Sequence, residues 1–154
     1  MSRFGGTTGS FAVLYAARDL ATALAETVVR DRFEGLTGRR LFVAELAGRS
    51  AVELTTTAPL RLVDLREGGC LKLGVSTEVT GAKGFGEAQV FAEQVYADPG
   101  IDGILYPSRL TGANCVAVFD HVIAAHLRAG LIVPLLQLED VGAALDSLNI
   151  KLIG

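Results

Sequence analysis

The chain has 154 residues, which is the length of one domain and is enough to bury a sizeable core. Half of the residues are apolar and 20% are charged, a composition that excludes a disordered protein. The net charge of −3, with acids and bases mixed along the chain, argues against a nucleic-acid-binding surface, and no apolar run reaches the roughly 20 residues that span a bilayer.

A buried strand followed by a helix is expected near the amino terminus. The run Phe11–Tyr15 is short and apolar and follows a Gly/Thr/Ser loop, which favours a buried strand. Asp19 suits the N-cap of a helix, because apolar residues then recur at helical spacing from Leu20 to Val28. Gly35 and Gly38 are expected to end this helix.

The next segment predicts three short strands. They cover Leu41–Leu46, Ala51–Thr56 and Leu60–Leu65, and turn residues separate them, including Pro59. Because the connections are short, an antiparallel meander is expected here.

The remaining elements complete one α+β domain over residues 1–154, with short, mainly antiparallel strands and three to four helices. Pro134 indicates an edge position or an interruption in its strand. Helices are expected over Glu87–Tyr96, Val122–Arg128 and Glu139–Leu148. Strands are expected over Ile101–Tyr106, Cys115–Phe119 and Leu131–Leu138, and Ile150–Ile153 is expected to close the sheet.

Three side chains whose functional groups suit binding or catalysis follow one another in the first strand-turn-helix unit. Arg3 lies near the amino terminus, Tyr15 ends the first strand, and Glu26 falls within the helix. An arginine near a terminus is usually solvated, and a strand-end tyrosine usually packs its ring. Glu26 lies beside the apolar stripe rather than opposite it, so its carboxylate is either paired or functional.

Ser108 is presented at a strand end, where sites are commonly built. The strand at Gly103 runs into Tyr106-Pro107-Ser108, and a polar loop with Gly112 and Asn114 follows. The structural alternative for Ser108 is a turn serine that bonds its own backbone. Asn114 is a weaker candidate for a polar contact, and a loop amide explains it equally well.

In these segments the chain resembles the RES-domain proteins, most of which are toxins of bacterial RES–Xre toxin–antitoxin pairs. The resemblance covers about residues 2–120. It depends on the order and spacing of five pieces: Ser2-Arg3-Phe4, Val13–Ala17, Thr22–Glu26, Gly103–Ser108, and Asn114 with Phe119.

The resemblance implies a fold similar to ADP-ribosyltransferases of the diphtheria-toxin type and an enzyme that uses NAD as its substrate, with no other cofactor and no metal. It implies cleavage of the nicotinamide–ribose bond by phosphorolysis, with phosphate as co-substrate, or by hydrolysis. Transfer of ADP-ribose to a cellular protein is an alternative, and a catalytically silent antitoxin-binding homologue is another. An Xre-family antitoxin is the implied partner, in the cytoplasm, with no nucleic acid or membrane bound directly; an oligomer remains open.

By the same resemblance, Arg3 would bind the phosphates or the adjoining ribose of NAD and would belong to the catalytic set. Tyr15 would stack on the nicotinamide, Glu26 would be the catalytic carboxylate, and Ser108 would line the nicotinamide pocket. These residue types suit the roles: a guanidinium forks onto phosphate oxygens, an aromatic face attracts a cationic ring, and a carboxylate stabilises a developing oxocarbenium ion. RES domains generally carry another arginine on a strand upstream of the Arg3 motif, so a strand preceding residue 1 is expected.

The cysteines, the histidines and one glycine-rich string do not form a catalytic or metal-binding pattern. Cys70 and Cys115 stand among apolar neighbours and are expected to be reduced core thiols. His121 and His126 do not share a helical face and lack further ligands, which argues against a metal site. The string Gly81–Gly86 lacks the P-loop pattern and is interpreted as a mobile loop before a helix, with a place at the pocket rim as the functional alternative.

Overall fold

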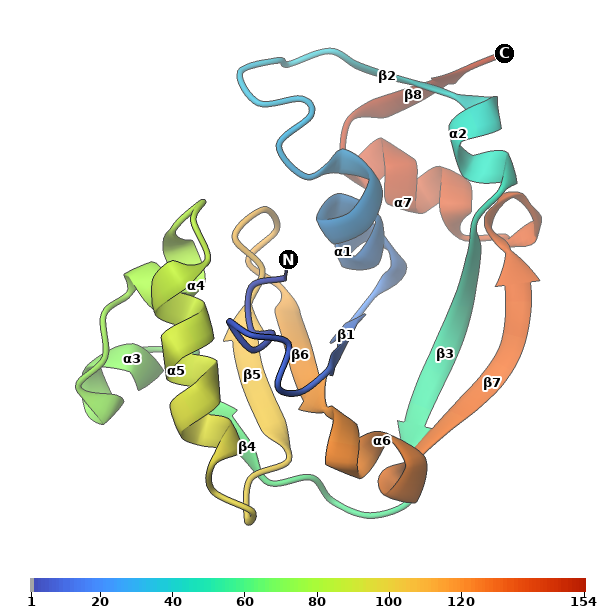
Figure 1. The fold of residues 1–154 in the computed structure, drawn as a ribbon. Helices are drawn as coiled ribbons and strands as arrows, with labels where there is room; N and C mark the ends of the chain where they lie inside the picture. Colours follow the sequence, from blue (N-terminus) through green and yellow to red (C-terminus); the bar gives the residue numbers. More distant parts are fainter. Residues whose placement is uncertain (1) are drawn as a thin grey trace.

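The computed structural model describes residues 2–154, and it has the expected α+β class. Its largest sheet has the strand order β1–β6–β5–β4 (Figure 1). Strands β1, β6 and β5 pair antiparallel, and β4 pairs parallel to β5. The bounds are Val13–Ala17 for β1, Leu62–Asp64 for β4, Gly103–Pro107 for β5 and Asn114–Phe119 for β6.

The other four strands form two separate pairs, so the predicted meander is wrong. Strand β2 (Arg39–Phe42) pairs parallel to β8 (Ile150–Ile153), and β3 (Ser50–Thr56) pairs antiparallel to β7 (Leu127–Pro134). The three strands expected to form a meander therefore lie in three different sheets. The short connections do not make these three strands pair with one another, because each of them pairs with a strand from the second half of the chain. Because β8 pairs with β2, it does not close the main sheet, and that expectation is wrong as well.

The strand predicted over Leu41–Leu46 stops at Phe42, where helix α2 (Val43–Ala47) begins. The Glu45 carboxylate accepts the Phe42 N–H at 3.1 Å, which satisfies one of the donors left free at a helix start. Glu45 also pairs with Arg32. Local capping thus overrode the apolar pattern that indicated a longer strand. Pro134 does interrupt its strand, since a short 3₁₀ turn, η2 (Leu135–Gln137), follows it.

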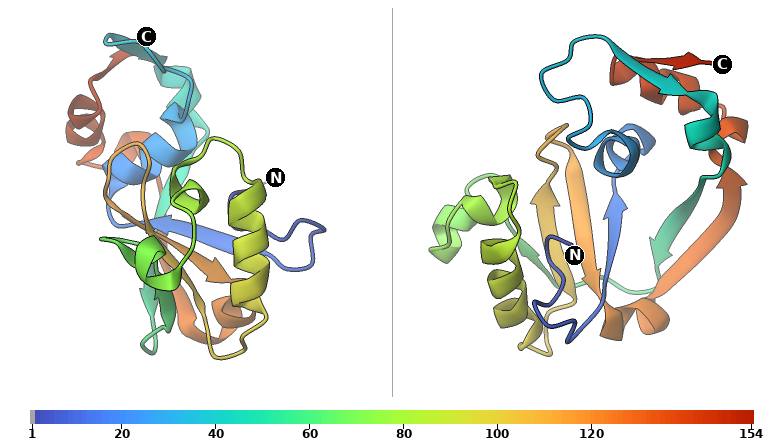
Figure 2. Two further views of the ribbon diagram at one scale, coloured as in Figure 1. Left: turned by 90° about the vertical axis from the view of Figure 1, so that its left-hand side faces the viewer. Right: turned by 45° about the horizontal axis from the view of Figure 1, so that its top comes forward.

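Helix α5 covers one face of the main sheet, and the amino-terminal segment lies beside it on the same face (Figures 1 and 2). The predicted helices near residues 87–96, 122–128 and 139–148 are all present, as α5 (Gly86–Tyr96), α6 (Asp120–His126) and α7 (Val141–Ser147). The chain has more helices than the three to four expected, because α2, α3 (Gly69–Leu73) and α4 (Glu78–Gly81) are too short to give a periodic signal.

Two hydrophobic cores hold the fold together. The first core lies between α5 and the main sheet and includes Phe4, Ile104 and Phe119. The second core includes Leu24 and Leu41 and packs the first helix against β2, α7 and β8. Both cysteines are free and buried in the first core, as expected. None of the helices in residues 2–154 combines the length and apolar composition needed to cross a lipid bilayer.

Gly103 marks a close approach between β5 and β6 in the main sheet. A β-carbon at this position would meet the Ala117 carbonyl oxygen at 2.3 Å, and the neighbouring contact is also backbone. We expect Gly103→Ala to lower the free energy of unfolding by about 1–3 kcal/mol, because the strands must separate to admit the methyl group. Urea unfolding measures this. The matched control is Gly86→Ala, where no atom lies within 4 Å; equal losses in both variants would contradict the prediction.

Candidate active site

A pocket of about 270 Å³ opens between the two cores. Its walls come from the amino-terminal segment, β1, the end of the first helix, the α4–α5 loop and the β5–β6 loop. This volume lies just below the roughly 300–1,000 Å³ typical of small-molecule sites. The lining residues are Ser2, Arg3, Tyr15, Glu26, Thr27, Arg30, Asp31, Thr80, Lys83, Phe85, Tyr106, Arg109 and Leu110.

Glu26 reaches this pocket from a distorted helix. Asp19 caps helix α1 (Leu20–Leu24) as expected, accepting the Thr22 N–H at 2.7 Å. The chain then widens into a π-helical turn, η1 (Ala25–Val29), and ends at Arg30 with φ 40°. The expected end at Gly35 and Gly38 is therefore wrong.

The early end of this helix has a local cause. The Thr27 hydroxyl donates to the Ala23 carbonyl at 2.7 Å, and the β-branched residues Thr27, Val28 and Val29 crowd the preceding turn. π-Helical turns of this kind are frequent at functional sites. Here the turn buries Val28 and Val29 while Glu26 lines the pocket.

Ser108 lies directly beside Glu26. Its hydroxyl donates to Glu26 Oε1 at 2.6 Å, across 82 residues of sequence, and Ser108 is only 3% exposed. Its oxygen also accepts the Leu110 and Thr111 N–H groups, each at 3.1 Å. Ser108 therefore makes both contacts that the sequence suggested: it bonds the backbone of its own turn, and it bonds a candidate site residue. Because the hydroxyl has one proton and that proton goes to Glu26, the contact fixes the orientation of the carboxylate.

Arg3 is held in the pocket wall by the segment around α4. Its guanidinium donates to the Ala82 carbonyl at 2.8 Å and to the Val79 carbonyl at 3.4 Å, and it lies over the Phe85 ring at 5.3 Å. Burial, and secondarily the nearby Arg109 cation, lower the pKa of Arg3 from its usual value. These contacts leave further N–H donors of the guanidinium for an anionic ligand.

Tyr15 connects the pocket wall to the amino-terminal segment. Its hydroxyl oxygen accepts the Phe4 N–H at 2.7 Å. Burial raises the pKa of Tyr15, so the hydroxyl stays neutral at physiological pH. The ring remains part of the pocket lining.

We expect Tyr15→Phe to lower the free energy of unfolding by about 1–3 kcal/mol, because the Phe4 N–H then loses the hydroxyl oxygen that accepts it. The ring, and with it the shape of the pocket, is retained. Thermal and urea unfolding measure the loss. An unchanged unfolding midpoint would show that water replaces the tyrosine oxygen at no cost.

Comparison with known proteins identifies the family to which this site belongs. The model of the RES domain matches residues 1–138. The chain belongs to the RES domain family. A curated relative, named "Probable toxin y4kH", from Sinorhizobium fredii (strain NBRC 101917 / NGR234), is 30% identical over 128 residues, which are 81% of this chain and the whole of that protein. No solved structure matches the chain, so the expected likeness to the ADP-ribosyltransferase fold stays a prediction.

The RES domain thus assembles Arg3, Tyr15 and Glu26 around one pocket, with Ser108 bonded to Glu26. Asn114 stands apart from them. It begins β6 opposite Pro107, and its carbonyl accepts the Arg18 N–H at 2.9 Å. Asn114 is not among the described residues that line the pocket.

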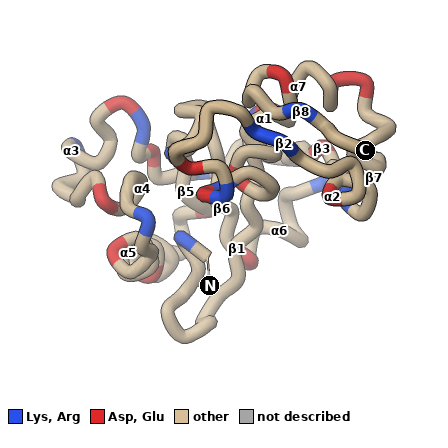
Figure 3. Tube along the Cα trace, turned by 90° about the horizontal axis from the view of Figure 1, so that it is seen from above, with Lys and Arg blue, Asp and Glu red and all other residues tan. Residues whose placement is uncertain are grey.

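The lining of the RES domain also includes an aromatic residue and three cations that were not singled out from the sequence. Tyr106 is 7% exposed and packs edge-on against Phe4 with ring centroids 4.9 Å apart. Burial raises its pKa above the usual value, so its hydroxyl stays protonated. Arg30, Lys83 and Arg109 add three cations to the wall. Figure 3 shows basic and acidic segments adjoining one another near β5 and β6.

A local signal existed for two of these residues. Arg109 directly follows Ser108, and Lys83 lies in the string Gly81–Gly86, whose place at the pocket rim was the functional alternative. Tyr106 resembles an ordinary strand residue in the sequence. Arg30 looks like the charged end of a helix, and only the early end of η1 brings it to the pocket.

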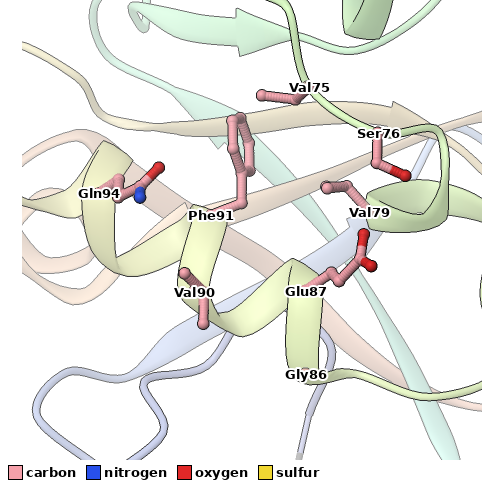
Figure 4. A pocket seen from close by; sticks show the side chains of 8 residues that line it. All are labelled: Val75, Ser76, Val79, Gly86, Glu87, Val90, Phe91 and Gln94. Carbon is pink, nitrogen blue, oxygen red and sulfur yellow. The ribbon is translucent and has the colours of Figure 1, made fainter.

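A second hollow of about 380 Å³ lies between α5 and the segment around α4 (Figure 4). Most of its lining is apolar, and Glu87 and Gln94 lie at opposite ends of it. It lacks a set of polar groups that converge on one point, which a catalytic site requires. No cluster of three or more potential metal ligands occurs in residues 2–154, and His121 packs against the Phe119 and Tyr96 rings.

Proposed function

We propose that this RES domain is the toxin of a toxin–antitoxin pair and that it cleaves the nicotinamide–ribose bond of NAD. Membership of the RES family and a relative named a probable toxin support the toxin assignment. The observation that carries the proposed reaction is the Glu26 carboxylate, oriented by Ser108 at 2.6 Å in the wall of a cationic pocket.

The pocket suits an anionic ligand with a cationic ring. Arg3 supplies guanidinium donors to phosphate oxygens, for which its planar geometry is well matched. Tyr15 and Tyr106 supply aromatic faces, and attraction between such a face and the nicotinamide cation contributes about 0.5–2 kcal/mol.

Cleavage needs charge stabilisation at the ribose. When the bond between the nicotinamide nitrogen and the ribose carbon breaks, both electrons leave with the nitrogen and neutral nicotinamide departs. The ribose carbon becomes an oxocarbenium ion, which the Glu26 carboxylate stabilises. Water or phosphate then adds to that carbon and loses a proton, giving ADP-ribose or its 1-phosphate.

Ser108 acts in this scheme through Glu26. Its hydroxyl proton is donated to Oε1, which leaves the second carboxylate oxygen free to approach the ribose. Holding the carboxylate in one orientation lowers the cost of reaching the transition state. The proposed antitoxin is an Xre-type protein, and co-expression with it is expected to relieve growth arrest caused by the toxin.

The direct test is incubation of the purified protein with NAD, with and without inorganic phosphate. Release of nicotinamide supports the proposal, and ADP-ribose 1-phosphate formed only with phosphate identifies phosphorolysis. Labelled NAD in a cell lysate distinguishes transfer, because a discrete labelled protein band then appears. Absence of both nicotinamide release and labelling, with tight binding of an Xre-type partner, would overturn the enzymatic assignment.

A further inference from the structure

Two ion pairs tie the loop after η1 to two other loops that line the pocket. This η1–β2 loop, residues 30–38, carries Asp31 and Glu34. Asp31 pairs with Arg109 of the β5–β6 loop, and Glu34 pairs with Lys83 of the α4–α5 loop at 2.6 Å. The partners are 78 and 49 residues apart in the chain, so these contacts depend on the tertiary fold.

The two cations also belong to the pocket lining. Together with Arg3 and Arg30 they give the wall four cationic side chains, against two carboxylates. Of those carboxylates, Glu26 accepts the Ser108 hydroxyl and Asp31 is the one paired with Arg109. The hydrogen bond from Arg109 lowers the pKa of Asp31, so its charge persists at neutral pH. A cationic wall of this kind, in a protein of net charge −3, favours an anionic ligand.

These ion pairs are weak enough to be exchanged. The side chains of Asp31, Glu34 and Lys83 are each more than half exposed. Such exposed pairs contribute little to stability, because water and salt screen them. A phosphate group offers more charge and more acceptor oxygens than one carboxylate, and a guanidinium binds it through two parallel hydrogen bonds.

The backbone need not move for this exchange. Phe33 lies between the two acidic residues and is only 8% exposed, anchored in the second core. The loop therefore stays in place while the Asp31 and Glu34 side chains rotate away. Arg109 and Lys83 already face the pocket and need no rearrangement of their own elements.

We propose that Arg109 and Lys83 bind phosphate oxygens of the ligand, and that Asp31 and Glu34 occupy these two cations in the free protein as internal competitors. Ligand binding exchanges each carboxylate for a phosphate oxygen. This rests on the proposed function only in taking the phosphate to be part of NAD or its co-substrate; the anion subsite itself stands on the ion pairs and the lining.

The test is binding of ADP-ribose, and separately of inorganic phosphate, by isothermal titration calorimetry. Asp31→Asn and Glu34→Gln are each expected to tighten binding about two- to fivefold, because they release a pocket cation. Arg109→Gln and Lys83→Gln are expected to weaken it, Arg109→Gln by about tenfold or more. A gain with inorganic phosphate as well as ADP-ribose assigns the subsite to free phosphate; a gain with ADP-ribose alone assigns it to the diphosphate.

Two comparisons separate exchange from a general effect of charge. Glu53→Gln removes an exposed carboxylate on β3, outside the pocket, and is expected to change affinity little. In an Arg109→Gln background, Asp31→Asn should have no larger effect than Glu53→Gln. Weaker or unchanged binding in Asp31→Asn and Glu34→Gln would overturn the proposal, since the ion pairs would then only support the pocket walls. The proposed NAD cleavage is tested by a different measurement, nicotinamide release by the unmodified protein, so its failure can be told apart from failure of the anion subsite.

Discussion

Glu26→Gln is expected to reduce nicotinamide release from NAD by about 100- to 1,000-fold, since the amide cannot stabilise the positive charge that develops on the ribose. The replacement keeps the size of the side chain and an oxygen that accepts the Ser108 hydroxyl. The fold should therefore persist, with an unchanged unfolding temperature. The measurement is a single-turnover assay of nicotinamide release at saturating NAD.

The matched control is Glu53→Gln, an exposed glutamate on β3 that does not line the pocket. It should retain full turnover. If Glu26→Gln kept more than about a tenth of the rate, the carboxylate would not be the group that stabilises the transition state, and the proposed mechanism would be wrong. A loss of rate together with a loss of folding would be resolved by circular dichroism of the same sample.

Phe4→Ala is expected to lower the free energy of unfolding by about 3–5 kcal/mol, the largest effect on stability that we expect. Phe4 is fully buried, packs edge-on against Tyr106 and donates its N–H to Tyr15. Removing the ring leaves a cavity between the amino-terminal segment and the main sheet. Because Arg3 is the adjacent residue, ligand affinity should fall as well.

Phe42→Ala is the control for this variant, because the Phe42 side chain is 53% exposed. Because about half of this residue is already exposed, its truncation should cost clearly less than that of the fully buried Phe4. Urea unfolding of both variants gives the comparison. Similar stabilities for the two would mean that the amino-terminal segment does not contribute to the first core.

The sequence predicted local elements better than their partners. Apolar periodicity located α5, and the short apolar runs located β5 and β6, because these elements bury one face against the first core. Strand pairing was missed where the partner lies far along the chain, as for β2 with β8. Periodicity carries no information about such partners, and at residues 43–46 the capping contact of Glu45 mattered more than the apolar pattern around it.

Those site residues that belong to local sequence motifs could be predicted from the sequence, and the others could not. Arg3, Tyr15, Glu26 and Ser108 belong to recognisable local motifs, and the fold brings them together. Arg30 was missed because the helical apolar spacing runs to Val28 and outweighed the β-branched residues that end the helix before Arg30. Asn114 has a recognisable motif, but the structure gives it a backbone contact at the start of β6.

The contact between Ser108 and Glu26 joins parts of the chain that are 82 residues apart. During synthesis, Arg3, Tyr15 and Glu26 leave the ribosome well before the β5–β6 loop exists. At about 5–20 residues per second, the interval is on the order of several seconds. A nascent chain therefore carries half of the pocket with no partner for its carboxylate. Assembly of the site is delayed until most of the polypeptide has been made, so a partly synthesised copy cannot yet hold the Glu26 carboxylate in its final orientation.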